Sequence, residues 1–154
     1  MINTEQKVSK IESMGGDGFY ELISKHLSKI GYSDIEKKGN HLIATLIGPI
    51  SNHIQGFIFM DQRLSGNMDF ISVKNILDEA KNELECFSLY IVSRNHISNG
   101  FKEHIKNEIK DMNVEYLGRD EIITKIDKYL PDFWKHDDVE LLDYEKNYCD
   151  LILR

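Results

Sequence analysis

The run from His41 to Arg63 constrains the fold of this 154-residue chain more than any other stretch. It holds two segments rich in β-branched, aromatic and aliphatic residues, His41–Ile47 and His53–Arg63, with Gly48-Pro49 between them. Such segments, bounded by turn-forming residues, predict two β-strands joined as a hairpin. We expect this hairpin to be the central pair of a sheet that helices cover. Any chemical site is expected at the ends of these two strands.

Apolar residues recur at helical spacing before and after the hairpin. The first such stripe begins at Phe19, ends before Gly31 and has Asp17 as its expected N-cap. His26 lies on this stripe, and we expect it to be a core histidine with its hydrogen bonds satisfied. Ser98 and Asp120 are the expected N-caps of two later helices. The further helices are predicted over 73–84, 101–112, 122–130 and 139–152.

Additional strands are predicted over 32–37, 86–93 and 114–117, and a short polar helix is expected over 3–14. From Phe19 onward the predicted order is α-β-β-β-α-β-α-β-α-α. The opening meander favours antiparallel pairing, and the later alternation favours parallel crossover units. The sequence therefore predicts an α/β fold with a mixed β-sheet and helices on both faces. We divide it into a domain over 1–130 and a C-terminal helical extension or linker over 131–154.

The composition and charge narrow the class of protein. The chain contains no run of about 18 apolar residues, so no membrane span is expected. Cys86 and Cys149 stand far apart in a chain that begins without a secretory signal pattern, which favours reduced thiols and a cytoplasmic location. The net charge of −7 repels nucleic-acid phosphate. A protein partner or self-association is therefore expected, although DNA binding through a local basic patch stays open.

Several motifs that often carry chemistry are incomplete in this chain. The run Gly15-Gly16-Asp17-Gly18 is not followed by Gly-Lys-Ser/Thr, so we interpret it as the entry to a helix. The histidines form no HExxH, and no CxxC accompanies them, so no zinc site is predicted. Two alternatives stay open: His41 and His53 could meet and bind a metal, and Phe133-Trp134 could stack on bases rather than pack.

Four stretches of the chain carry a family resemblance. FYELISKHLSKIGYSDI has a Phe-x-Glu start and a Leu-x-x-x-Gly-Tyr end, and DQRLSGNM places a small polar loop after a strand end. SLYIVSRNHISNGFKEHIK reads as a strand, a polar turn and a helix, and NVEYLGRDEIITKI as a last strand and helix. In these features the chain, from roughly Phe19 to Leu130, resembles the Mrr-type restriction endonucleases of the PD-(D/E)xK superfamily. The resemblance implies a restriction-endonuclease-like fold.

The resemblance also implies a catalytic pattern that this chain does not keep. The family places an Asp at the start of the second strand, and a Gln or Glu two residues before a Lys on the third. The carboxylates hold Mg²⁺, which activates water. These positions fall on His41, Met60 and Gln62. Glu21 matches a carboxylate that some members use on the first helix, and a one-residue bulge at Asp61 would bring a carboxylate inward.

Three functions follow from this pattern. The leading hypothesis is a non-catalytic interaction, assembly or DNA-sensing module of bacterial anti-phage defence, with no cofactor. The alternative is an active endonuclease with a migrated Mg²⁺ site that uses Glu21, Asp61 and also His41, while Gln62, at the degenerate Lys position, completes the set of candidate catalytic residues. A third is a DNA-binding module that uses Arg63, Lys74 and Arg94. LPDFWKHDDVELLDYEKNY resembles the segment that joins such domains to the NTPase core of STAND-type defence proteins, so the natural chain is expected to continue.

Overall fold

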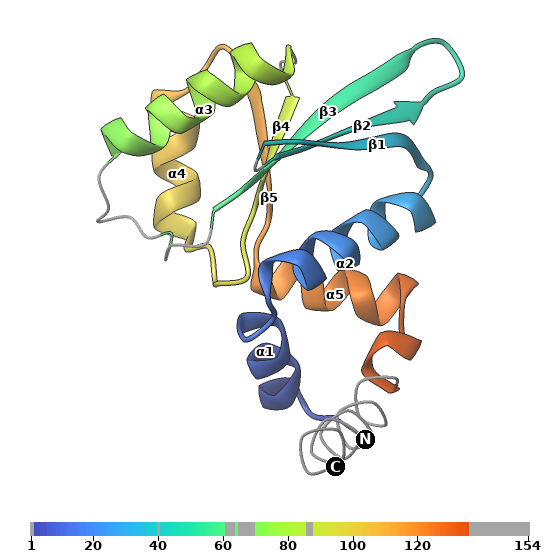
Figure 1. The fold of residues 1–154 in the computed structure, drawn as a ribbon. Helices are drawn as coiled ribbons and strands as arrows, with labels where there is room; N and C mark the ends of the chain where they lie inside the picture. Colours follow the sequence, from blue (N-terminus) through green and yellow to red (C-terminus); the bar gives the residue numbers. More distant parts are fainter. Residues whose placement is uncertain (1, 40, 61–63, 65–69, 86–87, 136–154) are drawn as a thin grey trace, which may run out of the picture.

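Five strands form one sheet in the computed structural model, which describes residues 2–39, 41–60, 64, 70–85 and 88–135 (Figure 1). The strands lie side by side in chain order, so β3 is the central strand. Their bounds are β1 Tyr32–Lys38, β2 His41–Ile47, β3 Asn52–Phe59, β4 Ser88–Val92 and β5 Asn113–Leu117.

The pairing of the strands changes at β3. β1 pairs antiparallel with β2, and β2 with β3, whereas β3–β4 and β4–β5 are parallel. Hairpin connections join the first three strands, and a helix crosses over before each of the last two, as parallel pairing requires. The predicted mixed sheet and the hairpin that contains its central strand are confirmed. β3 ends at Phe59, four residues short of the predicted end, and residues 61–63 lie outside the described part of the chain.

Helices cover both faces of the sheet, as predicted (Figure 1). The crossover helices α3 and α4 pack on one face, while α1, α2 and α5 pack on the other. Their bounds are α1 Thr4–Glu12, α2 Gly16–Lys29, α3 Phe70–Leu84, α4 Asn99–Glu108 and α5 Arg119–Tyr129. Most of the predicted extension over 131–154, including Cys149, lies outside the described residues, as does Cys86.

Strand alternation separates the apolar side chains into two cores. On β3, Phe57 packs with α2 and α5, whereas the next residue, Ile58, packs beneath α3 and α4. Successive strand residues point to opposite faces, so this short run serves both cores. Trp134 is also buried, in the core of α1, α2 and α5, and donates to Asp127 Oδ1 at 2.6 Å. Trp134 is therefore a packing residue rather than an exposed stacking platform.

The starts of the helices confirm one predicted cap and correct two others. The Ser98 hydroxyl accepts from the Phe101 N–H at 3.1 Å, as predicted. The predictions for Asp17 and Asp120 are wrong, because each lies inside the first turn of its helix. The N-caps are the glycines Gly15 and Gly118. An acidic side chain is favourable in a first turn as well as at the cap, since the helix N-terminus carries partial positive charge.

In the described part of the chain, no helix is both long and apolar enough to cross a membrane.

Candidate functional site

Two positions assigned from the family resemblance, His41 on β2 and Met60 directly after β3, lie on the face of the sheet that α3 covers. The register places His41 opposite Ile58, and Met60 follows two residues later on the same face. Met60 is only 2% exposed and belongs to the apolar core that also contains Val73 and Leu77 of α3. Its backbone N–H donates to the Val92 carbonyl at 2.9 Å, which keeps this end of the chain beside β4. The side chain at this position is therefore part of the apolar core, where a hydrated cation has no room.

His41 is half-buried on this face. Its Nδ1 is buried and has no hydrogen-bond partner among the described residues. Burial lowers the pKa of His41, and the nearby charge of Glu83 opposes that change only in part. A neutral imidazole is therefore favoured. His53 does not approach it, because the register pairs His53 with Leu46 at the other end of the hairpin. The predicted alternative of a His41–His53 metal site is wrong for this reason.

Glu21 lies on the other side of the sheet from His41 and Met60. It is exposed on α2, whose buried residues Leu22 and Ile23 belong to the opposite core. Asp61 and Gln62 lie outside the described residues. Within the described ranges, no group of three or more His, Cys, Asp or Glu side chains is placed to hold a metal ion. The structure thus places His41 and Met60 on one face of the sheet, whereas Glu21 lies on the helix that covers the other face.

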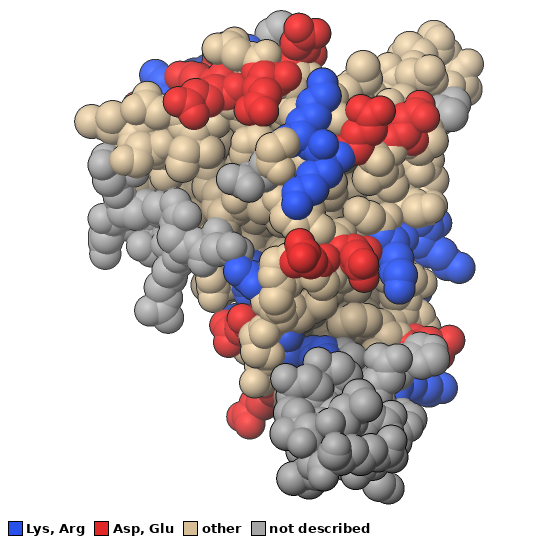
Figure 2. All heavy atoms as spheres, viewed as in Figure 1, with Lys and Arg blue, Asp and Glu red and all other residues tan. Residues whose placement is uncertain are grey.

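Two of the predicted DNA-binding residues are also separated. Lys74 is exposed on α3, whereas Arg94 donates to the Met14 carbonyl and lies over the Phe19 ring, 5.8 Å from its centroid. Arg94 thus contacts the helices on the opposite face. Arg63 lies outside the described residues. On the face seen in Figure 2, small acidic and basic groups alternate among the described residues, with no continuous basic surface.

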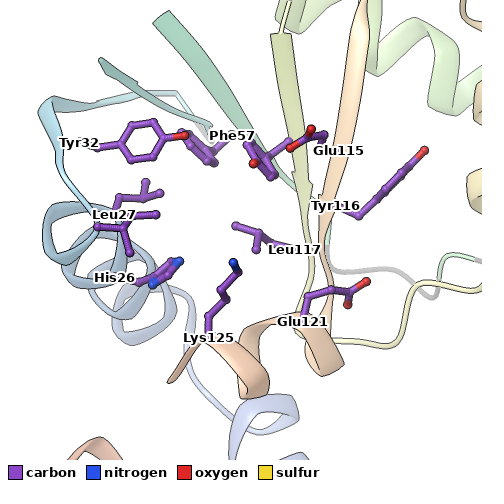
Figure 3. Close-up of a pocket in the computed structure, with 11 residues that line it drawn as sticks. His26, Leu27, Tyr32, Phe57, Glu115, Tyr116, Leu117, Glu121 and Lys125 are labelled. Carbon is purple, nitrogen blue, oxygen red and sulfur yellow. The ribbon is translucent and has the colours of Figure 1, made fainter. Parts of the chain in front are cut away.

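A pocket of about 230 Å³ lies between α2, α5 and the sheet (Figure 3). It is on the face opposite to His41 and Met60, because its aromatic wall belongs to the core of α1, α2 and α5. Phe57 and Tyr90, neighbours on the parallel pair β3–β4, form this wall with their rings stacked 5.1 Å apart at 8°. Tyr32 meets Phe57 edge to face, with centroids 5.7 Å apart. Leu27 and Leu117 add apolar surface.

Hydrogen bonds already engage the polar groups at the strand end of this pocket. The Tyr32 hydroxyl donates to Gln55 Oε1, and Gln55 Nε2 donates to Ser88 Oγ at 3.2 Å. Burial raises the pKa of Tyr90 well above its usual value, and the hydrogen bond and charge of Glu115 raise it further. Tyr90 is therefore a neutral hydroxyl that donates to the Glu115 carboxylate.

The helical end of the pocket is different, because it holds a buried ring nitrogen that has no hydrogen-bond partner among the described residues. His26 is 4% exposed, and its Nδ1 has no hydrogen-bond partner among the described residues. The prediction of a buried histidine is confirmed, but the prediction that its hydrogen bonds are satisfied is wrong. Burial lowers the pKa of His26, and the Lys125 charge lowers it further. In Figure 3 the Lys125 side chain points between His26 and Leu117 into the pocket. Sequence periodicity located His26 but not this neighbour, which comes from a helix a hundred residues away.

A separate cluster of charged residues lies at the carboxyl ends of β4 and β5. Arg119 donates to Glu12 of α1 at 2.9 Å and to Asp120 at 3.1 Å, and Asp120 also contacts His96. A His–Asp pair can transfer protons, but no serine or cysteine in the described residues hydrogen-bonds to His96 as a nucleophile would. The cluster joins α1 to α5 and is therefore best explained as structural. No family model, curated protein or solved structure matches this chain.

Proposed function

We propose that this chain is an Mrr-type, restriction-endonuclease-like domain that does not cleave DNA and acts in anti-phage defence as an interaction or assembly module. One observation carries the proposal: Met60, at the position of a metal-binding Gln or Glu in the family, is buried beneath α3. Replacing a hard oxygen ligand by a buried thioether removes Mg²⁺ coordination, since Mg²⁺ takes oxygen ligands. The mixed sheet with a hairpin followed by parallel crossovers supports the family resemblance.

Protein contact is favoured over DNA contact by the charges. The net charge is −7, and the face in Figure 2 mixes both signs. The net negative charge repels phosphate at long range and so weakens association with DNA. Interleaved charges of both signs suit a protein interface, because they fix how the two partners align. Lys74 and Arg94 lie on opposite sides of the sheet and do not act as one phosphate-binding surface.

The test is DNA cleavage by the purified protein on plasmid and phage DNA with Mg²⁺ or Mn²⁺, beside a Glu21→Ala/Asp61→Ala variant. We expect no cleavage, and calorimetry should detect no Mg²⁺ binding. Light scattering over a concentration series then measures self-association. Cleavage that the double variant abolishes contradicts the proposal and supports the Mg²⁺-dependent alternative. Cleavage that survives in the double variant indicates a contaminating nuclease.

A further inference from the structure

The two edges of the sheet differ in how they are protected from pairing with another chain. At the β1 edge, a bulge between Ser33 and Glu36 interrupts the strand, and Lys37 and Lys38 end it. Bulges and lysines are features by which proteins keep an edge strand from pairing further. β5, the other edge, is in regular register with β4 along all five of its residues and contains no lysine or arginine.

We propose that β5 pairs antiparallel with an extended segment of a partner protein that is apolar on one face and basic on the other. Such strand addition to a sheet edge obtains affinity from backbone hydrogen bonds and specificity from alternate side chains. This surface serves the interaction role proposed above, and the inference rests on that role. It lies on a different part of the sheet from His41 and Met60.

Two residues of β5 offer backbone groups to an added strand. The Leu117 carbonyl accepts from the Ser93 N–H at 2.9 Å, so the backbone groups of Leu117 face β4. Backbone groups alternate in direction along a strand, so those of Val114 and Tyr116 face away from β4. Among the described residues, none hydrogen-bonds to the N–H or C=O of Val114 or Tyr116. These are the groups that an added strand pairs with.

The α4 side of this edge favours apolar residues in the partner. The Val114 and Tyr116 side chains lie on this side and are only half-buried, so part of each is open to a neighbour. In Figure 3 the Tyr116 ring points to the other side of the sheet from Leu117. A hollow of about 290 Å³ adjoins both side chains and has Ile105 and Met112 in its lining. Apolar side chains of the added strand lose their contact with water there.

The other side of the edge favours a basic residue. Glu115 lies between Val114 and Tyr116, and its side chain is exposed. It accepts the Tyr90 hydroxyl, but a carboxylate has two oxygens and can accept further hydrogen bonds. Opposite charges on neighbouring strands stabilise their pairing. A lysine or arginine opposite Glu115 is therefore favoured, and the net charge of −7 attracts a basic segment at long range.

The same charge disfavours a second copy of this chain as the added strand. Two β5 strands that pair antiparallel about their centres place the two Glu115 carboxylates opposite each other, and like charges so placed are destabilising. A shifted register separates the carboxylates but pairs fewer residues of a strand that has only five. The edge therefore suits a different, basic chain better than its own copy.

The experiment is a titration of the ¹⁵N-labelled protein with the acetylated and amidated peptide VKVKVKV, whose valines share one face and whose lysines share the other. We expect saturable shifts at the β5 amides and slower hydrogen exchange at the amides of Val114 and Tyr116. The amides of Glu115 and Leu117 face β4, so their exchange should change less.

Two further peptides separate backbone pairing from charge. A VKVKVKV peptide that is N-methylated at its valines keeps every side chain but loses the N–H groups that face β5 in antiparallel pairing. It should give no saturable shifts. The acidic peptide VEVEVEV should bind about tenfold more weakly than VKVKVKV, because it places like charges opposite Glu115.

Variants of β5 test the same two contributions. Val114→Pro removes an N–H that faces away from β4, a position at which an edge strand tolerates proline. It should weaken binding by about tenfold, whereas Val114→Ile keeps the N–H and should bind like the wild type. Glu115→Gln should weaken binding by about threefold, while Glu79→Gln, at an exposed position on α3, leaves it unchanged. Far-UV circular dichroism confirms that each variant is folded.

The absence of saturable shifts with VKVKVKV at about 5 mM overturns the proposal. Equal binding of the N-methylated or the acidic peptide overturns it as well. If the Val114 and Tyr116 amides become protected as the protein concentration rises without peptide, a second copy takes the edge and the basic partner is wrong. If Val114→Pro does not fold, the N-methylated peptide makes the same test on the wild type. DNA cleavage is measured separately, so failure here removes this surface and leaves the absence of cleavage unaffected.

Discussion

His96 Nδ1 lies 2.6 Å from Asp120 Oδ2. His96 is in the segment that follows β4, and Asp120 is in the helix that follows the neighbouring strand β5. The contact joins the β4–α4 connection to the first turn of α5. Arg119 extends it to Glu12, so four side chains connect α1, α5 and the segment between β4 and α4. The same carboxylate lies at the positive end of the α5 dipole. A structural role for this cluster has consequences for stability that can be measured.

Replacing Asp120 by Asn should lower the free energy of unfolding by about 0.5–1 kcal/mol at pH 7, since the side chain is half exposed and the pairs are screened. Burial by itself raises the pKa of Asp120, but hydrogen bonds from His96 and Arg119 outweigh it and lower the pKa below 3.8. This stabilisation is therefore present above that pH and lost as pH falls further. Urea denaturation at pH 7 and pH 3 measures it. An equal difference at both values contradicts the assignment.

His26 should make the fold less stable in mild acid. Burial, and next the charge of Lys125, lower its pKa below 6.5 in the folded protein. The unfolded chain therefore binds the proton first, so stability is full above about pH 6.5 and falls below it, by up to about 1.4 kcal/mol per pH unit. In His26→Gln the melting temperature should fall less between pH 7 and pH 5.5. His53→Gln, at an exposed position, should keep the wild-type slope.

Substitutions at Met60 test whether this side chain is buried beneath α3 in solution. Met60→Glu should destabilise the protein by several kcal/mol, because it places a carboxylate among Val73 and Leu77 beneath α3. Met60→Leu conserves apolar volume and should cost less than about 1.5 kcal/mol. Urea denaturation of both variants gives the comparison. A fully stable Met60→Glu protein that binds Mg²⁺ would show that this face opens to solvent, contrary to the packing seen here.

Ser98→Ala should remove the cap of α4 and lower the free energy of unfolding by about 1 kcal/mol. The hydroxyl accepts from the Phe101 N–H, and no other described side chain is positioned to replace it. Ser28→Ala, at an exposed position within α2, is the matched control and should be near neutral. If both variants have the same stability, the Ser98 hydrogen bond contributes nothing in solution.

Local patterns predicted the elements well, because each signal depends on residues close in the chain. The alternating and β-branched segments gave β2 at its observed bounds, and the apolar stripe of Phe19, Leu22, Ile23, His26 and Leu27 became the buried face of α2. The caps were harder to predict. An aspartate is favourable both at an N-cap and in the first turn of a helix. Residue type alone therefore could not place Asp17 and Asp120 in the first turn, two residues after the actual N-caps. The Asn3–Gln6 capping box of α1 was missed, although Asn followed three residues later by Gln was a visible signal.

The sequence by itself determined the order of elements, the change from antiparallel to parallel pairing and the apolar side chain at Met60. These depend on periodicity and residue type. Only the tertiary structure decided which side chains share a face: it placed Glu21 across the sheet from His41, and Arg94 across from Lys74. It also brought Lys125 beside His26 and left the buried Nδ1 of His26 without a hydrogen-bond partner in the described part of the chain. Whether a polar atom has a hydrogen-bond partner, and what shape a pocket has, depend on residues that are distant in the chain. Local sequence patterns therefore do not predict them.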